Sequence, residues 1–266
     1  MLRDVDGVRI NVLDEGEGQA ILFLHGLGGC WRDWEPQLES LRDRFRVVVV
    51  EHRGHGRSDR VPGPYSIEEF AADALGACRD SGIDHAYVVG LSMGGMVAQR
   101  LALSAPSFVD ALVLCDTASH MEASGVEARR HAADLVRTQG FDALRAGARP
   151  WFGWSAVTMA ERPWVARNNQ RDGEGNDPEC WAWSLEALIG HDTRAELGHI
   201  EAPVLLVWGA EDTIVPVSFA EPLADALGGA PLVVLDAAGH VCNLEQPDAF
   251  DRAITRFFAA HPPASG

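Results

Sequence analysis

The feature that most constrains this chain is a sharp turn between a strand-like run and a helix-like run. Residues 85–89 are typical of a β-strand, residues 96–104 are typical of a helix, and Gly90-Leu91-Ser92-Met93-Gly94 connects them. Glycines on either side of Ser92 permit strained dihedral angles and close packing of helix against strand, because they have no Cβ. The pattern predicts that Ser92 is exposed at the carboxyl end of a strand, where helix N-terminal amides can stabilise developing negative charge.

Length and composition exclude several classes of protein. A chain of 266 residues suits one large α/β domain with an inserted segment. Its net charge of −17 argues against nucleic acid or an anionic membrane as a partner. The N-terminal residues do not form a secretory signal, and no segment approaches the roughly 18 consecutive apolar residues of a membrane span. We therefore expect a cytoplasmic protein.

Cysteine and histidine spacing indicates neither a disulfide framework nor a metal site. The five cysteines are widely spaced and form no C-x-x-C pair, which predicts reduced thiols. Residues 51–58 contain two histidines and an acid, but their spacing is not that of a helical metal-binding face. We expect these polar side chains to form hydrogen bonds within their own glycine-rich loop, without a metal.

Strand-like and helix-like runs alternate along most of the chain. The predicted strands are residues 8–13, 20–24, 46–50, 85–89, 111–115, 203–208 and 231–235. The predicted helices of this alternating part are residues 34–45, 66–81, 96–104, 220–227 and 247–260. Ser66 and Glu69 have the spacing of a capping box at the start of the second of these helices. The alternation is typical of an α/β protein with a mostly parallel, doubly wound sheet.

The alternation stops between residues 118 and 200, where no buried strand is predicted. This segment contains helix-like runs at 125–138, 141–148 and 178–189, and five of the eight tryptophans. We therefore expect residues 118–200 to be an inserted helical cap, and residues 1–117 and 201–266 to form the core. Tryptophans clustered in such a cap suggest the apolar roof of a pocket, and we select Trp151 and Trp154 as pocket candidates.

A serine nucleophile requires a base to accept its proton and an acid to orient that base. Both residue types follow later predicted strands: Asp212 follows residues 203–208, and His240 follows residues 231–235. The chain order Ser92, Asp212, His240 is the order found on this architecture. Glu211 and Asp116 remain alternative acids, and we favour Asp212.

The chain resembles the α/β-hydrolase-fold enzymes, and the resemblance covers nearly the whole sequence. It is carried by Ser92, Asp212 and His240 together with the segment Glu51-His52-Arg53-Gly54-His55-Gly56-Arg57-Ser58. It implies an oxyanion hole formed by the backbone amides of Leu27 and Met93. It also implies a cap over the active site, and neither a metal nor an organic cofactor. Further pocket candidates adjoin these positions, namely Gly26, Val215 and Val241.

Within that family, segments such as Leu114-Cys115-Asp116-Thr117-Ala118 resemble the 3-oxoadipate enol-lactonases. The chain departs from them at Leu24-His25-Gly26-Leu27-Gly28, where those enzymes commonly have Ser-Asn-Ser-Leu-Gly. We therefore expect a small-molecule carboxylic ester or lactone to be hydrolysed through an acyl-enzyme. The alternatives are a carbon-carbon bond hydrolase or a cofactor-free perhydrolase with the same triad, and a non-catalytic ligand receptor. The sequence makes no prediction of the oligomeric state.

Overall fold

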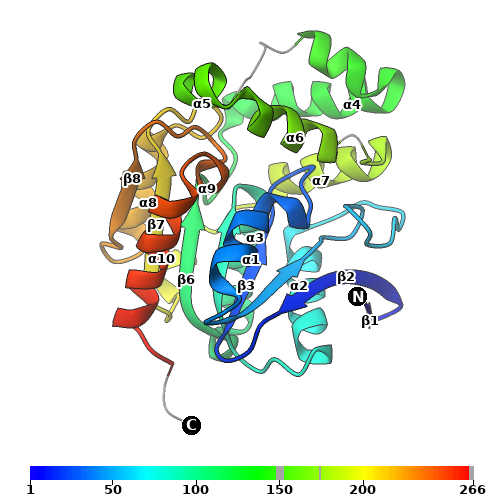
Figure 1. The fold of residues 1–266 in the computed structure, drawn as a ribbon. Helices are drawn as coiled ribbons and strands as arrows, with labels where there is room; N and C mark the ends of the chain where they lie inside the picture. The colour runs from blue at the N-terminus through cyan, green and yellow to red at the C-terminus, as the bar shows by residue number, and fades with distance from the viewer. Residues whose placement is uncertain (148–152, 174, 264–266) are drawn as a thin grey trace.

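The fold is built around one eight-stranded sheet, seen in a computed structural model that describes residues 1–147, 153–173 and 175–263 (Figure 1). The strand order is β1-β2-β4-β3-β5-β6-β7-β8. The strands are β1 (Leu2–Val5), β2 (Val8–Glu15), β3 (Ala20–Leu24), β4 (Arg46–Val50), β5 (Ala86–Leu91), β6 (Val109–Cys115), β7 (Val204–Gly209) and β8 (Leu232–Leu235). Strands β1 and β2 pair in antiparallel fashion at one edge, and all pairings from β4 to β8 are parallel.

Helices cover both faces of the sheet. Those of the alternating part of the chain are α1 (Glu35–Leu41), α2 (Ile67–Asp80), α3 (Met93–Ser104), α8 (Ala220–Ala226), α9 (Cys242–Glu245) and α10 (Pro247–Ala260). Leu22 and Val48 pack in the core that contains α2 and α3, whereas the adjacent Ile21 and Val47 pack in the core that contains α1 and α10. Successive side chains of a strand point to opposite faces. The continuous apolar runs of the sequence therefore correspond to strands buried on both sides.

The described residues between β6 and β7 include the α-helices α4 (Ala123–Gly147), α5 (Ala156–Glu161), α6 (Pro163–Gly173) and α7 (Pro178–Gly190). Gly140 has φ 77° and ψ 179°, which divides α4 close to the predicted boundary between two helical runs. In Figure 1, these helices lie beyond the arrowheads of the parallel strands, so they cover the carboxyl end of the sheet. Helices α5 and α6 were not predicted from the sequence.

Other differences from the prediction lie at the ends of elements and in short elements. Strand β1 and the four-residue α9 were not predicted. Helix α1 is shorter than the predicted residues 34–45, because it begins after a 3₁₀ turn, Trp31–Trp34, and already ends at Leu41. Helix α3 begins at Met93, directly after Ser92. Among the described helices, none is both long enough and apolar enough to cross a membrane.

Glycines allow β5, α3 and β3 to approach one another closely around the turn. A Cβ at Gly90 would collide with the carbonyl oxygen of Gly94, and a Cβ at Gly94 would collide with the carbonyl oxygen of Leu24. By contrast, no atom lies within 4 Å of a Cβ placed at Gly190, the last residue of α7. The start of α3 is therefore fixed against the sheet by backbone contacts that only glycine permits.

We expect Gly94→Ala to lower the free energy of unfolding by about 1–3 kcal/mol, since the new methyl group must displace backbone atoms. The matched control, Gly190→Ala, should leave stability unchanged within about 0.5 kcal/mol or raise it slightly, because the site is open. Urea denaturation followed by circular dichroism measures both. Equal midpoints for the two variants would contradict the steric argument.

Candidate active site

Ser92 lies in the turn between β5 and α3 with an unusual backbone. Its φ of 54° and ψ of −116° fall in a region that residues with a Cβ rarely adopt. Its N–H donates a hydrogen bond to the carbonyl of Cys115 (2.9 Å), and its own carbonyl accepts one from the Thr117 hydroxyl (2.6 Å). Contacts with the end of β6 thus stabilise a conformation that would be strained in isolation.

The structure brings Ser92 together with the two residues predicted to act with it. His240 Nε2 lies 2.9 Å from Ser92 Oγ, and His240 Nδ1 lies 2.8 Å from Asp212 Oδ2. The Asp212 side chain has no exposed surface, and its Oδ1 accepts hydrogen bonds from the N–H groups of Ile214 (2.7 Å) and Val215 (3.0 Å). The carboxylate is therefore fixed on one side while it bonds to the imidazole on the other.

The two alternative acids bond elsewhere. Asp116 is completely buried, and its Oδ1 accepts a hydrogen bond from the N–H of Gly209 (2.8 Å). Burial, together with the neighbouring charge of Asp212, raises the pKa of Asp116 well above its usual value. Glu211 accepts a hydrogen bond from the N–H of Ala156 (2.7 Å). Of the three candidates, Asp212 is the one bonded to the imidazole.

The loop after β3 supplies backbone N–H groups close to Ser92. A Cβ at Gly26 would lie 3.4 Å from the Cβ of Ser92, so this loop passes directly beside the serine. Gly28 N–H is already bonded to His55 Nε2 (3.1 Å). For the N–H groups of Leu27 and Met93, the described residues provide no acceptor. These two amides are thus available to bind an oxygen atom at the serine.

Buried neutral histidines support this loop. His25 Nδ1 donates to the carbonyl of Gly26 (2.8 Å), and His25 Nε2 accepts from the N–H of His52 (3.1 Å). Burial lowers the pKa of His25 to about 4 and that of His55 to about 3. Both rings are therefore neutral at pH 7, which leaves one ring nitrogen on each to accept a backbone N–H.

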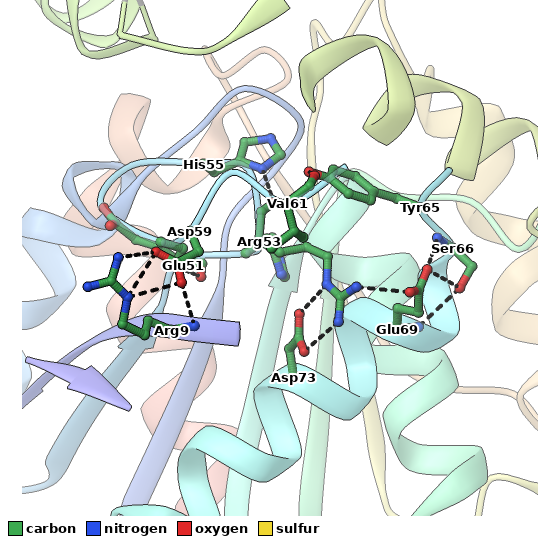
Figure 2. A network of polar contacts seen from close by, with 12 residues as sticks. Arg9, Glu51, Arg53, His55, Asp59, Val61, Tyr65, Ser66, Glu69 and Asp73 are labelled. Carbon is green, nitrogen blue, oxygen red and sulfur yellow. Dashed lines mark hydrogen bonds and ion pairs between the residues drawn. The ribbon is translucent and has the colours of Figure 1, made fainter. Parts of the chain in front are cut away.

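The loop after β4, which carries His52 and His55, is itself anchored to α2 (Figure 2). The Arg53 guanidinium donates to both carboxylate oxygens of Asp73 (2.6 and 2.8 Å) and to Glu69 (2.9 Å). Glu51 accepts a hydrogen bond from the N–H of Arg57 (2.7 Å). The polar side chains of this loop bond to the loop and its neighbours, and in the described part of the chain no cluster of three or more potential ligands could bind a metal.

Ser92 and His240 lie in the wall of a cavity of about 730 Å³. The predicted pocket residues Gly26, Val215 and Val241 also line it. The other side of the wall comes from the helices between β6 and β7, including Arg129 of α4 and Trp181 of α7. The cavity therefore lies between the carboxyl end of the sheet and these helices.

One of the two predicted tryptophan contacts needs correction. Trp154 is half-buried and is not among the described residues that line the cavity. Trp151 lies outside the described residues. Trp181, which was not predicted, lines the cavity and also lies close to the loop after β3, since its Nε1 would be 3.0 Å from a Cβ at Gly28. Arg129 was not predicted either. Periodicity assigns both residues to helices, but the orientation of those helices over the sheet decides which side chains enter the cavity.

Comparison with known proteins agrees with this fold and geometry. The sequence model of a family described as the alpha/beta hydrolase fold matches residues 19–247. The chain therefore belongs to the α/β-hydrolase family, and it has that family's mostly parallel sheet.

Individual relatives are similar over almost their whole length. The chain is 31% identical to 3-oxoadipate enol-lactonase 2 of Acinetobacter baylyi, covering 90% of this chain and 88% of that one. It is 31% identical to a putative carbamate hydrolase, RutD, of Agrobacterium fabrum, covering 91% and 94%. The crystal structure of an enol-lactonase from Burkholderia xenovorans superimposes with a TM-score of 0.90 and 31% identity, covering 97% of this chain and all of that one. The chain is thus a hydrolase that resembles enol-lactonases.

The buried histidines predict an acid-sensitive fold. Because the pKa of His55 is 6.5 when solvated and about 3 when buried, the unfolded state binds the proton more readily between these values. The free energy of unfolding should therefore decrease as the pH is lowered through this range, by about 2 kcal/mol from pH 7 to pH 5 for this residue.

The measurement compares urea denaturation of the wild type and His55→Gln at pH 7 and pH 5. The glutamine can still accept the Gly28 N–H but does not titrate, so His55→Gln should lose about 2 kcal/mol less stability than the wild type. His25, next to this ring, is present in both proteins, so its own titration contributes to both pH dependences. An identical pH dependence would contradict a neutral, buried His55.

Proposed function

We propose that this protein is a serine hydrolase that cleaves a carboxylic ester or lactone through an acyl-enzyme. The observation that carries the proposal is the continuous hydrogen-bonded series Ser92, His240, Asp212 in the wall of a cavity large enough for a small molecule. We further propose that the helices of residues 118–200 form the cap over this cavity. The substrate of the protein in this proposal is a small molecule. The cytoplasmic location expected from the sequence remains a prediction.

In the first half of the reaction, Ser92 Oγ attacks the carbonyl carbon while its proton passes to His240 Nε2. Asp212 stabilises the resulting imidazolium through His240 Nδ1–H and fixes the tautomer that leaves Nε2 free to accept the proton. The geometry supports this because the oxygen and Nε2 are already 2.9 Å apart. The N–H groups of Leu27 and Met93 donate to the carbonyl oxygen as it becomes negative, each contributing about 3 kcal/mol to transition-state stabilisation.

Collapse of the tetrahedral intermediate breaks the bond to the leaving oxygen, which receives the proton from His240. In a lactone, the alcohol and the acyl group remain one molecule, so the product leaves only after the second half of the reaction. Water then donates a proton to His240 and attacks the acyl carbon. When this second tetrahedral intermediate collapses, the bond to Ser92 Oγ breaks, His240 returns its proton to Oγ, and the acid is released.

The relatives guide the choice of substrate. The enol-lactonases support a lactone, and we propose an enol-lactonase-like activity as the specific form of the function. The relative named as a putative carbamate hydrolase supports a second candidate, because a carbamate carbonyl can be attacked by the same serine. Carbamates therefore belong among the substrates tested.

We expect the wild type to hydrolyse p-nitrophenyl esters or small lactones, and Ser92→Ala to lose at least about 10⁴-fold in kcat, because the nucleophile is removed. The panel contains p-nitrophenyl esters of increasing chain length, five- and six-membered lactones, and a phenyl carbamate. Peracid formation from acetate and peroxide is measured alongside. Equal activity in the wild type and Ser92→Ala would rule out the mechanism, and tight ligand binding without turnover would favour a receptor.

The acid can be assigned by comparing two substitutions. Asp212→Asn should lower kcat by about 10⁴-fold, because the amide no longer holds the imidazole in the correct tautomer or balances its charge. Asp116→Asn should retain activity within about threefold, because Asp116 does not bond to the imidazole and the amide oxygen can still accept the Gly209 N–H. Steady-state kinetics on the best ester measures both. Loss of activity in Asp116→Asn with retention in Asp212→Asn would reassign the acid to Asp116.

A further inference from the structure

Arg129 is a charged side chain in the wall of the same cavity as Ser92, at its helical side. It extends from α4 and is half-buried. Its recorded hydrogen bond joins Nη1 to the carbonyl of Gly125 one turn earlier in the helix, at 3.3 Å. Burial lowers its pKa, yet a guanidinium remains charged at all physiological pH values. The cavity therefore contains a permanent positive charge.

The face of α4 that meets the cavity leaves room around this guanidinium. Ser124, Gly125, Ala128 and Ala132 line the cavity from the same helix as Arg129. These four have small side chains. Gly125, Ala128 and Ala132 are three and four residues apart, which places them on one helical face, and Ser124 adjoins Gly125. A Cβ at Gly125 would collide with Nη1 of Arg129, so the glycine provides the space in which the guanidinium lies. Among the described residues of α4, Arg129 is thus the one cation that lines the cavity.

No carboxylate of the described residues forms an ion pair with Arg129, although α4 shows that such pairs form readily nearby. Arg137, two turns further along, is paired with Glu179 (2.9 Å) and with Glu186 of α7. Keeping a partly desolvated charge without a counter-ion is unfavourable unless another group supplies the opposite charge. Within the described part of the chain, the charge of Arg129 is therefore not balanced by a carboxylate.

The acidic groups of the cavity are engaged with other partners. Asp33 Oδ1 accepts a hydrogen bond from Asn169 (2.8 Å), and Glu122 Oε1 lies 3.0 Å from His120 Nε2. These carboxylates line the cavity but do not bond to Arg129. The guanidinium therefore remains available to a ligand, and its parallel N–H groups match the two oxygens of a carboxylate.

We propose that Arg129 binds a carboxylate of the substrate, so that the enzyme selects esters or lactones carrying a second, ionised acid group. The inference rests on the proposed function, because it assumes that the acyl group bonded to Ser92 and the group bonded to Arg129 belong to one molecule. The carboxylate is distant from the carbonyl that reacts, and its binding orients that carbonyl toward Ser92. Arg129 determines specificity in this way and takes no part in proton transfer.

The test compares matched substrates that differ in one charge. Monomethyl esters of succinic, glutaric and adipic acids carry a carboxylate, and methyl butanoate, pentanoate and hexanoate are their neutral counterparts. We measure kcat/KM by proton release in 0.15 M salt, which screens the long-range repulsion from the acidic protein. The wild type should prefer at least one anionic ester by about tenfold or more over its counterpart, as expected of a hydrogen bond to a charged group.

Arg129→Gln should reduce this anionic-to-neutral ratio by about tenfold or more, mainly through KM, and Arg129→Lys should restore part of it because the charge is kept. The matched control is Arg130→Gln, which removes one charge from the exposed neighbour on the same helix and should leave the ratio unchanged. The ratio is insensitive to a partial loss of folded protein. An unchanged ratio in Arg129→Gln, or no anionic preference in the wild type, would overturn the inference.

A second measurement separates this inference from the proposed function. Isothermal titration calorimetry with sodium hexanoate should show binding to the wild type and to Ser92→Ala, and binding at least about tenfold weaker to Arg129→Gln. If no ester or lactone is hydrolysed, the proposed function fails, and the calorimetry alone decides the role of Arg129. If neutral esters are hydrolysed but hexanoate binds equally to the wild type and to Arg129→Gln, the function stands and the carboxylate site is refuted.

Discussion

The backbone of Ser92 is the constraint on which the rest of the site depends. A residue with a Cβ occupies φ 54° only when its surroundings compensate for the strain. Here the compensation comes from bonds to Cys115 and Thr117 at the end of β6, and from glycines at 90 and 94 that let β5, α3 and β3 meet closely. Strands β5, β6, β7 and β8 are neighbours in the sheet, and their carboxyl ends lie at the same end of it. The turn at Ser92 is therefore at the end of the sheet where Asp212 follows β7 and His240 follows β8.

Neutral buried histidines are the second requirement of this arrangement. The loop after β3 leaves the N–H of Leu27 without an acceptor among the described residues, yet its other polar groups need partners because they are buried. His25 and His55 supply these partners by accepting and donating hydrogen bonds, and as neutral rings they introduce no charge close to the proposed oxyanion hole. Arg53 fixes the loop that carries His55 to α2 (Figure 2). The positions of the free amides thus depend on a network that extends well beyond the serine.

Sequence patterns predicted the parallel sheet and the meeting of Ser92, Asp212 and His240, because each of the three follows a strand whose apolar run is unmistakable. The same patterns did not predict features that depend on contacts between residues far apart in the sequence. Strand β1 is short and half-exposed, and the Asp-Gly turn after it, with φ 50° and 82°, was the signal that could have identified it. Nothing local indicates that Trp181 lines the cavity and Trp154 does not, since the packing of helices over the sheet decides this.

The sheet side and the helical side of the cavity have different roles. Its sheet side is built from strand ends whose geometry is fixed by hydrogen bonding between strands, and this geometry holds Ser92 and His240 at the positions that the proposed acyl transfer requires. Its helical side can change one residue at a time without disturbing the sheet. A single arginine on the small-residue face of α4 is enough to add a charge requirement to chemistry that is itself indifferent to charge. Selectivity in such a fold therefore resides in the helices between β6 and β7, at a distance from the atoms that react.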